Sequence, residues 1–189
     1  TTADVLRAAL WLIGLAPEVK SVSSFFLMIL PGAHERVLTF ADCGVLPDPT
    51  AEQLAEIACL AADRHQRLTR EVPHVAMLSF STKGSAEHPH VLKVREATAL
   101  ARARRPDLHI DGEMQADAAL NPFAAESKEV AGSVAGKASV LVFPDLNSGN
   151  IASKMAQHIA DIPAYGQILT GLERPAAEIS RGASAHDIF

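Results

Sequence analysis

Short apolar runs and helical segments alternate along this chain, and this alternation constrains its fold more than any other feature. The continuous run SSFFLMIL at Ser23–Leu30 and the segments His74–Phe80 and Ser139–Phe143 have the length and hydrophobicity of buried strands. Helical periodicity extends over about residues 91–104 and 150–160. A chain built in this way is predicted to form an α/β fold with a mainly parallel sheet flanked by helices.

Local signals add an antiparallel element and a long helix. Pro31-Gly32 is a turn signal between the apolar run and Arg36–Phe40, which is expected to form a hairpin partner or a neighbouring strand. Thr50 and Gln53 form a capping box that predicts the start of a long helix. The apolar face of that helix carries Leu54, Ile57, Ala58, Ala61 and Ala62.

Weaker signals complete the secondary structure. Thr2 is expected to cap a first helix that ends near Leu12. Short strands are expected at Leu108–Asp111 and Ile168-Leu169. Residues 121–137 are rich in Ala, Gly, Ser and charge without periodicity, so they are expected to form a loop.

Composition excludes several classes of protein. The 189 residues carry a formal net charge of -5, which disfavours nucleic acid as a partner. No apolar run approaches the roughly 20 residues of a membrane span, and residues 1–15 lack the basic region of a signal peptide. Cys43 and Cys59 do not make a disulfide framework, so a cytoplasmic protein is expected. Cys59, Met28 and Met77 are expected in the core.

The richest polar stretch is FPDLNSGN, which ends at Asn150. It is predicted to be a buried strand, a turn at 144–149 and the start of a helix. Such a helix start offers N–H groups to an anion, and Lys154 lies one turn further on. A plain strand–helix connection, with Asn147 or Ser148 as the cap, explains the same residues equally well.

A second candidate is Ser180-Arg181-Gly182, followed by Asp187. Arginine offers a planar fork for phosphate or carboxylate, serine adds a hydroxyl, and the aspartate is a candidate base. Taken alone, a surface loop with a helix cap at Ser184 explains this segment more simply. The segment also lies next to the end of the chain, where a helix is starting at Asp187-Ile188, so the chain is expected to be cut from a longer protein.

Three further clusters are weaker. The loop STKGS at 81–85 contains Ser81 and Lys83 and loosely resembles a phosphate loop, but an ordinary strand–helix loop is equally consistent. Asp111-Gly112-Glu113 and Asp117 form an acidic group that could be a paired-carboxylate site, but an exposed turn and helix start is the favoured explanation. His88-Pro89-His90 has no third ligand at suitable spacing, so a solvated loop is favoured over a metal site.

Eight segments in the same order resemble the phosphate acetyltransferase family. They are TTADVLRAAL, SSFFLM, ADCGVLPDPTAEQLAEIA, VAMLSFSTKGS, PDLHIDGEMQADAAL, VAGKASVLVFPDLNSGNI, ILTGLERP and SRGAS followed by DI. The resemblance implies a fold like that of the isocitrate and isopropylmalate dehydrogenases, with two α/β domains and a cleft between them. It makes this chain the C-terminal portion of such an enzyme. Residues 16–160 would be the second domain with the dimer contacts, and 1–15 and 161–189 would belong to the first.

The resemblance also implies site residues. Ser180, Arg181 and Asp187 match the catalytic segment of the family. The family's residues that bind substrate or coenzyme A are matched at Asn150, Lys154, Tyr165, Thr1 and Thr2, and the loop residues Ser81 and Lys83 are added as candidates. The chain departs from the family pattern at Ser153, at Gly166-Gln167-Ile168 where Gly-Pro-Ile is usual, at Ala177 and Glu178, and in the loop 121–131.

The implied reaction is the reversible transfer of an acetyl group between acetyl phosphate and coenzyme A. The thiolate of coenzyme A would attack the acetyl carbonyl directly, with Asp187 as the base, Arg181 on the phosphate and Ser180 as a donor. No metal and no cofactor beyond coenzyme A is expected. A homodimer is expected, with no nucleic acid and no membrane as partner. The alternative is a non-catalytic domain that senses acetyl-CoA, as in the C-terminal part of some malic enzymes.

Overall fold

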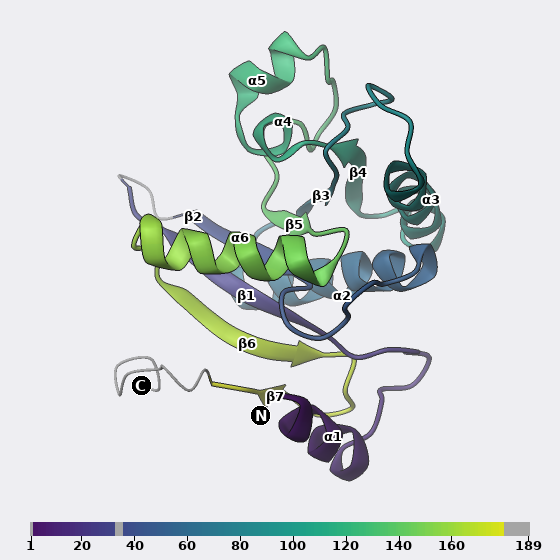
Figure 1. Ribbon diagram of the computed structural model, residues 1–189, viewed down its shortest axis with the longest axis vertical. Helices are drawn as coiled ribbons and strands as arrows, with labels where there is room; N and C mark the ends of the chain where they lie inside the picture. Colours follow the sequence, from purple (N-terminus) through teal and green to yellow (C-terminus); the bar gives the residue numbers. More distant parts are fainter. Residues whose placement is uncertain (1, 33–35, 180–189) are drawn as a thin grey trace.

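The strands form one mixed sheet. The computed structural model describes residues 2–32 and 36–179, and within them a seven-stranded sheet has the order β4-β3-β5-β2-β1-β6-β7 (Figure 1). The strands are β1 (Ser23–Leu30), β2 (Arg36–Ala41), β3 (His74–Leu78), β4 (His109–Met114), β5 (Val140–Val142), β6 (Ala164–Thr170) and β7 (Ala176–Ala177). Strands β2, β5, β3 and β4 are parallel neighbours, as predicted.

Strand β1 is the antiparallel element. It pairs with β2 on one side, where Phe25 lies opposite Ala41, and with β6 on the other, where Phe25 lies opposite Ile168. The side chains of Phe25 and Met28 are fully buried. The unusual apolarity of Ser23–Leu30 is therefore explained by its place between two strands inside the sheet.

Helices cover both faces of the sheet. They are α1 (Thr2–Leu12), α2 (Ala51–Thr69), α3 (Pro89–Arg104), α4 (Ala116–Leu120), α5 (Pro122–Ser127) and α6 (Leu146–Ile159). Helices α2 and α3 pack on one face with Val75, Met77 and Val142, and α4 and α6 border the other with Ala76 and Leu141. The predicted capping box of Thr50 and Gln53 opens α2. None of the helices in the described ranges combines the length and apolarity needed to cross a membrane.

Four local predictions were wrong. Helix α6 begins at Leu146 and is capped by Asp145, whose carboxylate accepts from the Ser148 N–H at 2.8 Å, so neither Asn147 nor Ser148 is the cap. The expected turn at 144–149 is therefore mostly the first turn of α6. The expected loop 121–137 contains α5, which Asn121 caps. Strands β4 and β6 extend beyond the short segments predicted for them because long-range pairing with β3 and β1, invisible to local sequence patterns, prolongs them.

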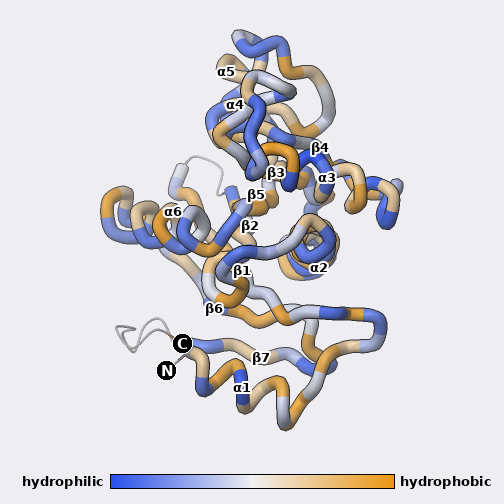
Figure 2. Tube along the Cα trace, turned by 45° about the vertical axis from the view of Figure 1, so that its right-hand side comes forward, coloured by the Kyte–Doolittle hydropathy of each residue, from blue (hydrophilic) through white to orange (hydrophobic). Residues whose placement is uncertain are grey.

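Helix α1 packs against the C-terminal part of the chain. Its Ala9 shares a small buried cluster with Val22, Leu169 and Leu172, and Figure 2 places α1 and β7 together at the end of the molecule opposite α5. The two segments that the resemblance assigns to the first domain are thus in contact. Strand β6, assigned to the first domain, also pairs with β1, assigned to the second. The described chain therefore shows no separation at residue 160, and the domain boundary there stays a prediction about the longer protein.

Candidate functional site

The carboxyl end of β2 and the start of α6 form one compact unit. Strand β2 ends at Ala41 and continues into Asp42 and Cys43. Gly149, in the first turns of α6, lies so close that a Cβ added to it would be 2.2 Å from the Asp42 carbonyl oxygen. A side chain at residue 149 would push the helix away, so glycine fixes α6 directly over the end of β2.

Two predicted site residues share one exposed face of this unit. Asn150 and Lys154 are exposed and stand one helical turn apart on α6. The Asn150 side-chain amide donates to the Cys43 carbonyl at 3.1 Å, which joins the helix to the end of β2. Ser153 between them is buried, and its hydroxyl donates to the Asn150 carbonyl at 3.0 Å.

Two N–H groups at the helix start are already engaged and are not free in the way that the sequence suggested. The Leu146 N–H donates to the Pro47 carbonyl at 3.0 Å, and the Ser148 N–H donates to the Asp145 carboxylate at 2.8 Å. These donors are satisfied within the protein. The positive charge of Lys154 and the polar face beside it therefore remain as the features that attract an anion here.

Asp42 organises the loop after β2, and the sequence analysis missed it. Its carboxylate is 2% exposed and accepts hydrogen bonds from five donors, which are the Ser24 N–H and hydroxyl and the N–H groups of Gly44, Val45 and Leu46. Backbone N–H groups wrapped around a carboxylate satisfy a buried anion without a cation. The available signal was an aspartate directly after a strand, followed by a glycine two residues on.

The thiol of Cys43 is inert in this setting. It is fully buried, and burial together with the neighbouring Asp42 raises its pKa far above the ordinary range, although a contact with Ser153 partly opposes this. A thiol with a raised pKa is a poor nucleophile because only the thiolate reacts. Burial also raises the pKa of Cys59.

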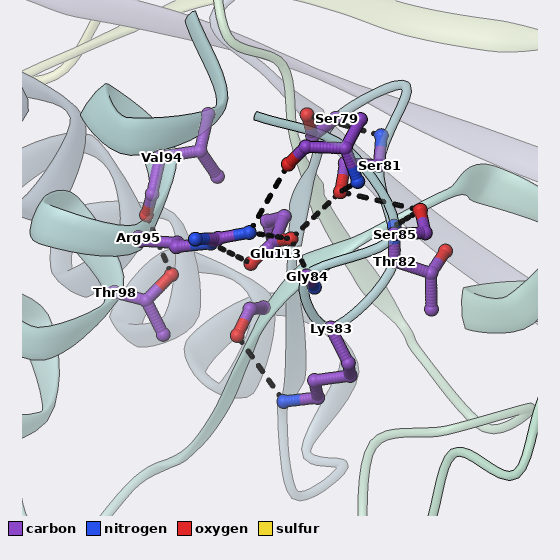
Figure 3. A network of polar contacts seen from close by, with 12 residues as sticks. Ser79, Ser81, Thr82, Lys83, Gly84, Ser85, Val94, Arg95, Thr98 and Glu113 are labelled. Carbon is purple, nitrogen blue, oxygen red and sulfur yellow. Dashed lines mark hydrogen bonds and ion pairs between the residues drawn. The ribbon is translucent and has the colours of Figure 1, made fainter. Parts of the chain in front are cut away.

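The loop 81–85 binds an internal carboxylate. Figure 3 shows Glu113 of β4 surrounded by donors from this loop and from α3. The Ser81 hydroxyl donates to Glu113 at 2.9 Å, the Gly84 N–H at 2.8 Å, and the Arg95 Nε at 3.0 Å. Burial raises the pKa of Glu113, but the Arg95, Gly84 and Ser81 hydrogen bonds outweigh it, so the pKa lies below its usual value. Ser81 is fully buried, so the structure gives no support to its prediction as a substrate contact.

Lys83 is likewise engaged with β4. Its ammonium contacts the Asp111 carboxylate and donates to the Gly112 carbonyl at 3.1 Å, and Arg102 also pairs with Asp111. Asp111 and Glu113 are buried in a strand, so the exposed acidic turn favoured from sequence is wrong. These charges are explained by two buried carboxylates of β4, which pair with partly exposed cations of α3 and of the loop after β3. Asp117 is the exception, since it is exposed and pairs with Lys128 at 2.7 Å.

The remaining predicted residues are spread over the chain. Tyr165 is 55% exposed on β6, opposite Leu27 of β1. Thr2 is the first residue of α1. The described chain ends at Ile179, so the catalytic candidates and one threonine lie outside the described residues, namely Ser180, Arg181, Asp187 and Thr1.

Neither the two cavities described next nor a cluster of metal ligands points to a further site that brings the predicted residues together. Two cavities, of about 330 and 420 Å³, lie beside β4 and α5, and Lys83 is the one predicted site residue that lines either of them. His88 and His90 are exposed and their rings stack edge to face at 4.6 Å. Within residues 2–32 and 36–179, no three or more His, Cys, Asp or Glu side chains are arranged to hold a metal ion.

Comparison with known proteins defines the class. The model of a family described as phosphate acetyl/butaryl transferase matches residues 1–189. The chain therefore belongs to the phosphate acetyl/butaryl transferase family. It is 49% identical to a phosphate acetyltransferase of Acetivibrio thermocellus, over 100% of this chain and 58% of that protein, and 50% identical to that of Escherichia coli K12, over 100% of this chain and 26% of that protein.

Solved structures agree with the fold. A phosphotransacetylase from Streptococcus pyogenes superposes with a TM-score of 0.92 at 47% identity, covering 100% of this chain and 56% of that one. A branched-chain phosphotransacylase from Enterococcus faecalis V583 matches with a TM-score of 0.79 at 25% identity, covering 97% and 65%. The chain thus spans 58% of the Acetivibrio thermocellus protein, 56% and 65% of the two solved structures, and 26% of the Escherichia coli protein, as expected for a portion of a longer enzyme.

Proposed function

We propose that the protein containing this chain is a phosphate acetyltransferase, which reversibly transfers an acetyl group between acetyl phosphate and coenzyme A. The observation that carries the proposal is an identity of about 50% to phosphate acetyltransferases. The matched region is the entire chain, so it includes every segment that bears a predicted site residue. Asn150 and Lys154, side by side at the carboxyl end of the sheet, are consistent with an anion site there.

The proposed reaction is a single displacement. The sulfur of coenzyme A forms a bond to the acetyl carbon, the bond from that carbon to the phosphate oxygen breaks, and phosphate leaves with the electron pair. Asp187 accepts the thiol proton. If Asp187 only orients the thiol, since a carboxylate near an arginine is a weak base, the departing phosphate takes that proton. Arg181 stabilises the charge that grows on phosphate and on the carbonyl oxygen, and Ser180 donates a hydrogen bond to it.

The resemblances favour acetyl as the transferred group. The two phosphotransacetylase structures are 47% and 40% identical to this chain, whereas the branched-chain phosphotransacylase is 25% identical. We expect kcat/KM for acetyl phosphate to exceed that for butyryl phosphate. No metal and no cofactor beyond coenzyme A is included in the proposal, and a chelator in the assay is expected to leave turnover unchanged.

A homodimer remains part of the proposal. The apolar run Ser23–Leu30 does not offer a surface for it, because this run pairs on both sides within the sheet as β1. Helix α6 instead exposes Ile151, Met155 and Ile159 along one side. Light scattering on the full-length protein gives the mass that tests this.

The direct test is to incubate the full-length protein with acetyl phosphate and coenzyme A and to measure the acetyl-CoA formed by chromatography. Lys154→Met is expected to raise the KM for coenzyme A or acetyl phosphate about tenfold, since one lysine contact to a phosphate contributes on the order of 1–2 kcal/mol. The matched control is Lys137→Met, an exposed lysine outside the unit of β2 and α6, which should leave both constants unchanged. Failure of the wild-type protein to form acetyl-CoA would overturn the proposal.

A further inference from the structure

A cavity of about 330 Å³ lies beside β4, the last strand at one edge of the described sheet. Strands β3 and β5 separate β4 from β2, which puts β4 and β2 roughly 14 Å apart at the usual spacing of strands. The cavity is therefore distinct from the candidate site at the end of β2 and the start of α6. Its charged and polar side chains come from the loop after β3, from α3, from β4 and from the loop before β5, and they are Lys83, Arg102, His109, Asp111 and Ser133.

Two cations at this cavity share one carboxylate. The Lys83 ammonium and the Arg102 guanidinium both contact Oδ1 of Asp111, whose side chain is buried. Lys83 has a second anchor, the Gly112 carbonyl at 3.1 Å, and Figure 3 shows its side chain pointing away from the donors around Glu113. Nε of Arg102 donates to the Ile110 carbonyl at 2.7 Å. One carboxylate balances one of two positive charges, so two fixed cations leave an excess of one positive charge.

Further donors at the cavity have no partner within the described protein. The terminal nitrogen Nη1 of Arg102 contacts no acceptor in residues 2–32 and 36–179, and this side chain is 52% exposed. The successive N–H groups of Ala131, Gly132 and Ser133 likewise donate to no group of the described chain. Successive backbone N–H groups in a turn are a common arrangement for binding an anion.

The excess of positive charge is local to this cavity. The chain as a whole has a formal net charge of -5. His109 adds a further positive charge at the cavity when it is protonated, and its ring is held by stacking on His74, with centroids 5.0 Å apart, and by the Ser133 hydroxyl 3.2 Å from Nδ1. The acidic side chains of Glu126 and Glu129 line the second cavity instead. An anion is therefore the ligand that complements the cavity beside β4.

We propose that this cavity binds a phosphate group, either free phosphate or the phosphate of a small ester, at a site separate from the one proposed for acetyl transfer. The planar fork of Arg102 and the ammonium of Lys83 face the phosphate oxygens, and the Ser133 hydroxyl is a further donor. The volume is roughly ten times the 30 Å³ that one water molecule occupies in the liquid, so the cavity has room for an organic group beside the phosphate.

Histidine NMR on the full-length protein tests the proposal. His109 lines the cavity, so its ring Cε1–H resonance, identified as the one that is missing in His109→Gln, reports on this cavity alone. Titration with inorganic phosphate or with glycerol 3-phosphate is expected to shift this resonance to saturation, whereas sodium chloride at the same ionic strength should not. Tighter binding of glycerol 3-phosphate would assign the site to phosphate esters, and tighter binding of inorganic phosphate would assign it to the free ion.

A pair of variants at Ser133 tests the role of charge. Ser133→Glu places a carboxylate at the cavity and is expected to weaken phosphate binding at least about tenfold, because like charges a few ångströms apart repel. Ser133→Gln is the matched neutral control and should change Kd less than about threefold. Ser133 is exposed, so both variants keep the pairs that Asp111 makes with Lys83 and Arg102. Phosphate should also raise the Tm of the wild type and of Ser133→Gln more than that of Ser133→Glu.

Three outcomes would overturn the inference. If neither phosphate probe shifted the His109 resonance to saturation, or if Ser133→Glu bound phosphate as tightly as Ser133→Gln, the cations would serve only to hold α3 and the loop after β3 against β4. If Lys154→Met abolished the shift of His109, phosphate would be acting from the site proposed for acetyl transfer. Failure of the wild-type protein to form acetyl-CoA would overturn the proposed function but not this inference, since the NMR titration requires no turnover.

Discussion

The carboxylate of Glu113 and the guanidinium of Arg95 form a two-pronged ion pair, with Nε 3.0 Å from Oε2 and one terminal nitrogen 3.2 Å from Oε1. This pair holds α3 against β4 and gives the loop 81–85 an internal anion to wrap around. The polar groups of that loop therefore serve a structural role, since they donate hydrogen bonds to the Glu113 carboxylate.

Glu113→Gln should lower the free energy of unfolding by about 1–3 kcal/mol, because it leaves the donors from Arg95, Gly84 and Ser81 with a neutral and partly mismatched partner. Urea denaturation at neutral pH measures the effect. The control is Asp117→Asn in the exposed pair with Lys128, which should cost no more than about 1 kcal/mol. Equal losses in the two variants would contradict the structural role of Glu113.

The buried His65 and the half-buried His74 should make the protein less stable in mild acid. Burial lowers the pKa of His65, and burial together with His109 lowers that of His74. The unfolded chain, with histidine pKa values near 6.5, then binds more protons than the folded chain, so stability present above about pH 6.5 is lost as the pH falls. His65→Gln should flatten the slope of unfolding free energy between about pH 7 and pH 5. An unchanged slope would show that His65 does not contribute.

Cys43 should not serve as a covalent nucleophile, although it lies beside Asn150. Cys43→Ala is expected to reduce kcat only a few-fold and to lower stability by about 1 kcal/mol through the small cavity it leaves. Mass spectrometry after incubation with acetyl phosphate should find no acetyl group on this residue. A loss of about 100-fold in kcat by a folded Cys43→Ala protein would instead indicate an acyl-enzyme step.

Much of the fold follows from local sequence patterns. Continuous hydrophobicity located β1, β3 and β5, and the capping box located the start of α2, because these signals depend on neighbouring residues. The pattern failed for α5, whose six residues are too short to show helical periodicity. It also failed at the start of α6, where Asp145 rather than a later residue makes the cap.

The candidate site was less predictable, since it depends on contacts distant in sequence. Asp111 and Glu113 resembled an exposed turn because their partners Arg102 and Arg95 lie on another element. The hydrogen bond from the Asn150 amide to the Cys43 carbonyl joins residues 107 positions apart, and no local sequence pattern indicates it. Asn150 and Lys154, by contrast, were correctly placed on one face of a helix, because their spacing of four residues alone determines that they share a face.

We propose that the full-length protein transfers acetyl groups to coenzyme A with Arg181 at the reacting centre. The most direct test is the steady-state rate of the full-length Arg181→Ala variant with acetyl phosphate and coenzyme A. An arginine that stabilises charge developing in the transition state should, when removed, cost about 10²- to 10³-fold in kcat with a much smaller change in KM for coenzyme A, and Arg181→Lys should restore only part of it. A near-normal kcat in a folded Arg181→Ala enzyme would contradict the account.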